Sequence, residues 1–209
     1  MSVLAFHKEE RWKVGIWYIE ESIDELLEML PSERNYREQI ELFTSAVRRR
    51  EWLAARVLLQ EMCGEHKEVA YTESHNPYLT DGSYHISISH TKGYVAVMLS
   101  RDYEVGVDIE FISNRVKNIR HRFLSYEENK IIRPERELQQ LLVCWCTKET
   151  LFKLLDKVGV RFSYDLKIHP FVLEHRGSLQ AQELLTPEKH LYTVSYVVTK
   201  HYVITCALQ

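Results

Sequence analysis

Three acidic residues, Asp108, Glu110 and Glu149, are the side chains in this sequence with types and spacing best suited to chemistry. In an extended segment alternate side chains share a face, so Asp108 and Glu110 would lie about 7 Å apart on one side of a strand. Two carboxylates at that spacing repel each other unless water or a cation lies between them. A D-x-E pair alone therefore leaves open a metal site or an ordinary strand with one solvated face.

The position of Glu149 favours the metal site. Apolar side chains recur at helical spacing between residues 138 and 152, and Glu149 follows Leu142 by seven residues and Trp145 by four, on the same face. Burying an ionised carboxylate is costly unless it is paired or binds a metal. Three carboxylates suit Mg²⁺, which binds few protein oxygens and keeps its other positions for water and phosphate. The sequence thus predicts a magnesium site at these three acids.

Two further residues could contact a phosphate beside such a metal. Lys153 follows Glu149 by four residues, so it could form an i,i+4 ion pair or direct its ammonium at a phosphate, and we favour the phosphate. His90 ends a predicted strand next to the strand that carries Asp108. A phosphate contact there competes with an ordinary structural hydrogen bond.

The elements that must position these residues are read from hydrophobic periodicity and turn signals. Capping-box spacing marks two helix starts, at Ser22 and at Ser125. Pro134 opens a long helix that carries Glu149, and Gly159 follows its end. The helix that begins at Ser22 spans 22–30, and one more helix is expected at 45–63. Strands are expected at 13–19, 69–74, 84–89, 94–100 and 104–112, with a strand pair in 191–209.

The chain also contains a weak internal repeat. Residues 84–97 and 192–205 match at six of fourteen positions, and in each case a helix followed by glycine precedes the matching segment. We therefore expect an α+β fold of two similar halves related by a pseudo-two-fold axis, each a small antiparallel sheet packed with a long helix. The halves would span residues 1–111 and 112–209.

Composition excludes several classes of function. A net charge of −3 over 209 residues gives no general attraction to nucleic acid or to a membrane surface. No apolar stretch approaches the roughly 20 residues that a membrane helix needs, and no signal peptide is evident. The four cysteines are expected to be reduced and buried. We expect a monomeric cytoplasmic protein.

Four motifs in order resemble those of the 4'-phosphopantetheinyl transferases. "GVDIE" and "WCTKETLFK" resemble the family's two-part signature, approximately G-(I/V)-D-(I/V)-E and W-(S/T/C)-x-K-E-(A/S)-x-x-K. "SISHT" resembles its phosphate-contacting Ser-His segment, and "RFLSYEE" its F-(F/L)-x-x-x-E block. The resemblance covers roughly residues 48–159 and the repeated tail, and it is closest to the longer single-chain, pseudo-dimeric type.

The resemblance implies transfer of the phosphopantetheine arm of coenzyme A to a serine of an acyl or peptidyl carrier protein, with release of 3',5'-ADP. It implies that the three acids hold Mg²⁺, that Lys153 steadies a reacting phosphate, and that Glu149 or, in reserve, Glu127 acts as general base. Further contacts to coenzyme A are implied for Ser89, His90, Arg50, Arg56 and Lys148.

Two features depart from this pattern or extend it. Asn76 stands where the family often has a nucleotide-binding lysine, which leaves one phosphate cation missing. The basic residues Arg115, Lys117, Arg120 and Arg122 are a candidate docking surface for an acidic carrier protein, although a run of charges is often only a solvated face. A magnesium-dependent phosphohydrolase, or a non-catalytic nucleotide- or carrier-binding relative, remains an alternative; the acidic pI argues against a nuclease.

Overall fold

The computed structural model describes residues 3–8, 11–32 and 34–209 of the chain. They form two compact units, Met1–Asp102 and Tyr103–Gln209. Each unit contains an antiparallel sheet and helices that pack on it, which confirms the expected α+β class. The division falls before the strand predicted at 104–112, and that strand pairs within the sheet of the C-terminal unit. No helix in the described ranges has the length and apolar character of a bilayer-spanning segment.

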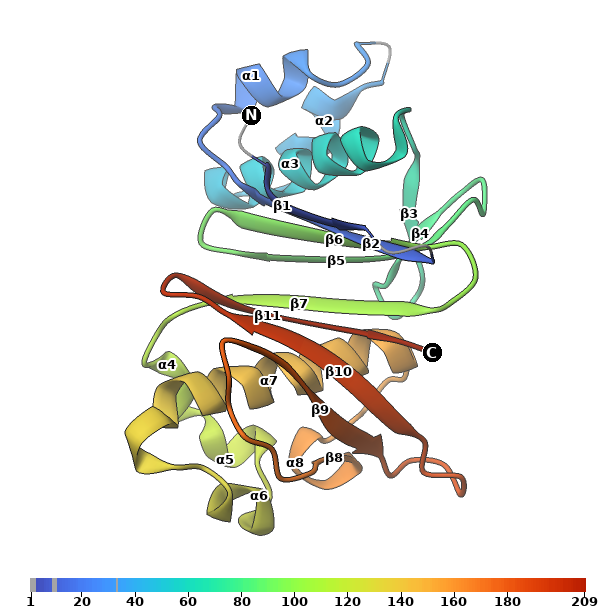
Figure 1. The fold of residues 1–209 in the computed structure, drawn as a ribbon. Helices are drawn as coiled ribbons and strands as arrows, with labels where there is room; N and C mark the ends of the chain where they lie inside the picture. Colours follow the sequence, from blue (N-terminus) through green and yellow to red (C-terminus); the bar gives the residue numbers. More distant parts are fainter. Residues whose placement is uncertain (1–2, 9–10, 33) are drawn as a thin grey trace. The chain divides into compact units, whose positions relative to one another are not determined.

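The N-terminal unit is built on a four-stranded sheet in the order β1-β2-β6-β5, with the helices gathered on one side of it (Figure 1). Its strands are β1 (Val3–Lys8), β2 (Trp12–Tyr18), β5 (His85–Thr91) and β6 (Tyr94–Ser100). Its helices are α1 (Ile23–Glu28), α2 (Tyr36–Glu41) and α3 (Ala46–Cys63). A separate pair consists of β3 (Val69–Tyr71) and β4 (Pro77–Leu79).

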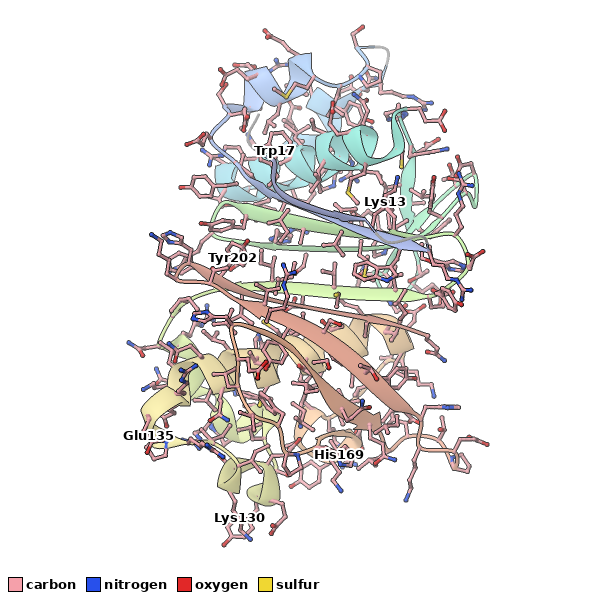
Figure 2. The ribbon with its side chains drawn as sticks, viewed as in Figure 1. Lys13, Trp17, Lys130, Glu135, His169 and Tyr202 are labelled. Carbon is pink, nitrogen blue, oxygen red and sulfur yellow. The ribbon has the colours of Figure 1, made fainter. Side chains whose placement is uncertain are left out.

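Helix α3 is the central helix of this unit. Ser45 caps its first turn, and Gly64 ends it at a φ of 74°, in the left-handed region that favours glycine. A Cβ on Gly15 of β2 would lie 2.7 Å from the Met62 sulfur, so glycine lets α3 lie directly on the sheet. The fully buried Trp17, labelled in Figure 2, belongs to the same core.

The C-terminal unit is built on a five-stranded sheet in the order β7-β11-β10-β9-β8, with α7 lying across it (Figure 1). The strands are β7 (Val105–Phe111), β8 (Leu166–Ile168), β9 (Arg176–Glu183), β10 (Leu191–Val198) and β11 (Tyr202–Leu208). The helices are α4 (Arg115–Asn118), α5 (Arg120–Phe123), α6 (Tyr126–Lys130), a 3-10 turn (Pro134–Arg136), α7 (Glu137–Leu155) and α8 (Phe162–Asp165).

Close approach fixes where α7 lies on the sheet. A Cβ on Gly106 of β7 would lie 2.5 Å from the backbone oxygen of Thr150, so only glycine fits at this crossing. One turn of the same helix is tied to β11, because the Thr150 and Thr205 hydroxyls share a buried hydrogen bond of 2.6 Å. These contacts hold the neighbouring Glu149 and Lys153 beside β7.

Most predicted elements are present, with differences at the ends. Both capping boxes form, at Ser22 and at Ser125. Pro134 opens a 3-10 turn rather than α7 itself, and α7 ends at Asp156 in a left-handed conformation, before Gly159. The two segments of the internal repeat are both antiparallel hairpins, β5–β6 and β10–β11.

Candidate active site

One face of β7 is turned toward α7. Gly106, Asp108 and Glu110 alternate along the strand and therefore share a face, and Gly106 marks it as the face that α7 covers. Asp108 is only 5% exposed, and Glu110 is half-buried. The face with the two acids is consequently covered by a helix and is not the solvated face of an ordinary strand.

Glu149 of α7 belongs to the same electrostatic environment as these two acids. Burial, more than any other cause, raises the pKa of its carboxyl to about 7; the negative charges of Asp108 and Glu110 contribute to this rise, and the positive charge of Lys153 opposes it. A carboxylate whose pKa responds to two others lies close to both. The structure therefore places Glu149, itself half-buried, within electrostatic reach of the two acids of β7.

Lys153 reaches across to β7. Its ammonium donates hydrogen bonds to Asp108 Oδ1 at 2.8 Å and to the Val107 carbonyl oxygen at 3.0 Å, and so partly neutralises the acidic group. With side chains in these positions, no three His, Cys, Asp or Glu side chains of the described ranges form a metal-binding group. The donor types nevertheless fit Mg²⁺, since all three are carboxylates.

Two residues in contact with the acids were not predicted. The Trp145 indole donates a 2.9 Å hydrogen bond to Glu110 Oε1, and its ring is held edge-on against Phe123. The Cys146 thiol is fully buried; burial raises its pKa well above the ordinary value, and the negative charges of Asp108 and Glu110 raise it further. Both residues stand within "WCTKE", but nothing in their spacing identifies the carboxylates that they contact.

Lys148, predicted to contact coenzyme A, is fully buried within the C-terminal unit. Its ammonium lies 2.7 Å from Glu128 Oε1 and donates to the Phe162 and Leu166 carbonyl oxygens, both at 2.8 Å. Burial lowers the pKa of Lys148, against the attraction of Glu128. The residue joins α7 to α6 and to the segment around α8, so these contacts give it a structural role.

Glu127, the reserve general base, lies on the outer surface of α6. Its side chain is 75% exposed and pairs with Lys130 at 2.7 Å; Lys130 is labelled in Figure 2. Counting F-(F/L)-x-x-x-E from Phe123 reaches Glu128 instead, which is buried. Glu128, and not Glu127, therefore holds the position of the glutamate in this motif.

The remaining predicted phosphate contacts belong to the N-terminal unit: Ser89, His90, Arg50 and Arg56. The His90 Nδ1 lies 2.9 Å from a carboxylate oxygen of Glu51. Ser89 is buried, and Arg50 donates a long hydrogen bond to a backbone oxygen. The Arg56 guanidinium is also buried, 3.1 Å from the centre of the Trp52 ring, and burial lowers its pKa.

The segment that contains the three acids also matches known proteins. Residues 104–207 match the family model described as the 4'-phosphopantetheinyl transferase superfamily, so the chain belongs to this superfamily through its C-terminal unit. Relatives include "4'-phosphopantetheinyl transferase AcpT" of Salmonella typhi, 34% identical over 113 residues, and of Escherichia coli strain K12, 30% identical over 112 residues. Each match covers 51% of this chain, and 59% and 57% of the relatives respectively, so the chain spans less than two thirds of their length.

The buried pair of Lys148 and Glu128 predicts a large loss of stability on substitution. Lys148→Met keeps the length of the side chain but leaves Glu128 charged and buried, which should lower the free energy of unfolding by about 3–5 kcal/mol. Urea denaturation measures the difference. The control Lys130→Met removes an exposed ammonium and should change stability by less than about 0.5 kcal/mol. Equal effects of the two variants would contradict the structural role of Lys148.

The raised pKa of Glu149 predicts a pH-dependent gain on neutralising it. The folded protein holds this proton up to about pH 7, whereas the ordinary carboxyl loses it near 4.5. The free energy of unfolding therefore falls as pH rises between these two values, because only the unfolded state releases the proton there. The full loss of stability is reached above pH 7. Without divalent cations, Glu149→Gln should raise the melting temperature by a few degrees at pH 8 and by less at pH 6. A variant that melts lower than wild type at pH 8 would contradict the coupling.

Proposed function

We propose that this protein transfers the 4'-phosphopantetheine group from coenzyme A to a serine of an acyl or peptidyl carrier protein, with Mg²⁺, releasing 3',5'-ADP. The observation that carries the proposal is the convergence of Asp108, Glu110 and Glu149 on one electrostatic environment, inside the segment that matches the superfamily. The names of the relatives support the same activity. We place the reaction in the cytoplasm and the protein as a monomer.

The residues fit a magnesium ion by the chemistry of their donors. Three carboxylates whose negative charges repel one another are stabilised by a divalent cation more strongly than by one ammonium. Bound there, Mg²⁺ would neutralise and orient the diphosphate of coenzyme A. Lys153 would then exchange Asp108 for a phosphate oxygen, which supports its proposed role at the reacting phosphate. Trp145, through its hydrogen bond to Glu110, would orient one ligand.

The chain's own groups supply the proton transfer. The serine oxygen of the carrier attacks the phosphorus that bears the pantetheine arm, and the bond from that phosphorus to the departing 3',5'-ADP breaks. The serine proton goes to Glu149 through a water molecule, because a carboxylate that binds Mg²⁺ directly is acidified and accepts a proton poorly. Exposed Glu127 is the weaker candidate.

The N-terminal unit is proposed to hold the nucleotide. His90 and Ser89, with Arg50 and Arg56 in supporting roles, would contact phosphates of coenzyme A, and Asn76 would leave one phosphate with fewer cations. We also propose that the chain consists of two related halves. The support is that both repeated segments form hairpins and that each unit pairs its sheet with one long helix.

A mass measurement tests the transfer directly. Wild-type protein, coenzyme A, Mg²⁺ and an unmodified carrier protein should yield a carrier heavier by one phosphopantetheine. Glu149→Gln should reduce the rate by at least about 100-fold, since general acid–base catalysis alone contributes 10²–10⁴-fold. Glu127→Gln, at an exposed position, should stay within about twofold of wild type.

Other outcomes identify the alternatives. Release of inorganic phosphate without a mass gain would indicate a phosphohydrolase. Binding of coenzyme A with neither product would indicate a non-catalytic relative. Loss of transfer in Glu127→Gln with normal turnover of Glu149→Gln would reverse the assignment of the base.

We further propose that the basic surface of α4 and α5 receives the carrier protein. Lys117 and Arg120 already pair with Glu137, at 2.7 and 2.9 Å, whereas the side chains of Arg115 and Arg122 are exposed. Carrier domains resemble one another in presenting acidic helices beside the modified serine. The two exposed arginines therefore supply the charge for docking.

Charge reversal tests this docking surface. Arg115→Glu with Arg122→Glu should raise KM for an acidic carrier about tenfold and leave the affinity for coenzyme A unchanged. The matched control, Lys157→Glu with Lys167→Glu, changes the net charge equally at exposed positions outside α4 and α5 and should leave KM near that of wild type. Similar KM changes in both double variants would contradict docking at this surface.

A further inference from the structure

Glu51 is a buried acid that belongs to none of the sequence motifs. It lies in the second turn of α3, and its side chain is only 8% exposed. One carboxylate oxygen lies 2.9 Å from Nδ1 of His90, the last residue but one of β5. A buried carboxylate is costly unless a hydrogen-bond donor satisfies it, and the imidazole is a donor when Nδ1 carries the proton.

We propose that Glu51 is a positioning residue: it holds the His90 ring with Nδ1–H against its carboxylate, so that Nε2 is presented to a phosphate oxygen of the donor substrate. This inference rests on the proposed function, in which His90 contacts coenzyme A. It assigns Glu51 no contact with the substrate.

The backbone of His90 is fixed, but its ring needs a further contact to hold one orientation. The backbone of His90 is fixed in the β5–β6 ladder opposite the fully buried Val95, but a strand residue can still rotate about χ1 and χ2. The Glu51 hydrogen bond removes that freedom and selects the tautomer. A carboxylate that accepts from Nδ1 keeps the proton on Nδ1, so that in the neutral ring Nε2 carries none. The His90 side chain remains 34% exposed, which leaves a surface for a ligand.

The proposed geometry also defines the charge of the ring in the complex. With Nδ1–H directed to Glu51, a phosphate oxygen accepts from Nε2 only when Nε2 also carries a proton. The bound ring is then an imidazolium with an anion on each nitrogen, and its hydrogen bonds are charge-assisted. A purely structural bond between Glu51 and His90 would require no second proton on ligand binding.

Nitrogen NMR of His90 tests the tautomer without any assay of activity. At a pH where the ring is neutral, wild type should carry the proton on Nδ1. Glu51→Gln keeps an acceptor and should keep this tautomer, whereas Glu51→Ala should lose the preference. Glu61→Ala, an exposed acid on the same helix, is the control and should match wild type. A wild-type proton on Nε2 would overturn the proposal.

Binding of coenzyme A tests the role of the pair. Calorimetry should show about tenfold weaker affinity for Glu51→Ala, and almost no further loss when Glu51→Ala is added to His90→Ala, because the acid acts through the ring. Additive losses, or a wild-type ring that stays neutral when coenzyme A binds, would overturn the positioning role. Failure of wild type to bind coenzyme A would instead refute the proposed function and the phosphate contact together, while the tautomer would still decide what Glu51 does to His90.

Discussion

Repulsion among three carboxylates is the constraint on which the C-terminal unit depends. Asp108 and Glu110 are held on the covered face of β7, and Glu149 stands above them on α7 with its pKa raised to about 7. A fold selected for stability alone would place apolar side chains at such positions, because desolvating like charges together is unfavourable. The ammonium of Lys153 offsets part of the repulsion through Asp108. A divalent cation would offset the negative charge that remains, and could then bind a diphosphate.

The surrounding structure keeps this unfavourable arrangement from relaxing. Gly106 lets the backbone of α7 come against β7, and the paired Thr150 and Thr205 hydroxyls hold the same turn to β11. One residue before Glu149, Lys148 is tied to Glu128 and to two backbone oxygens. A helix anchored on both sides of Glu149 has little freedom to turn its carboxylate into bulk water.

Sequence patterns predicted on which faces of their elements the three acids lie, because those faces follow from strong periodicities. Alternation in a strand placed Asp108 and Glu110 together, and helical spacing placed Glu149 on an inner surface. The same reasoning described α7 as having one apolar stripe, whereas the helix is buried around most of its circumference; a single sequence does not reveal how many elements cover a helix. Strand β9 was missed because its polar residues, in "RGSLQAQE", obscure the alternation of buried positions.

Residues whose roles depend on partners distant in sequence were the least predictable. Lys148 reads as a cation available to a phosphate until the structure shows Glu128 beside it. Glu51 reads as one of several charges on α3 until β5 places His90 against it. In both cases the local sequence specifies the element, but only the packing of two elements determines whether the charge faces solvent, substrate or a buried partner.

The ionisation of Glu149 in the metal-free protein tests the central claim most directly. Carbon-detected NMR of its side-chain carboxyl, followed from pH 4 to pH 9, should give a midpoint near 7, and saturating Mg²⁺ should move that midpoint to lower pH because the cation favours the charged form. A midpoint near the ordinary value of 4.5 that Mg²⁺ leaves unchanged would mean that neither burial nor the neighbouring acids act on Glu149, and the proposed site would be wrong.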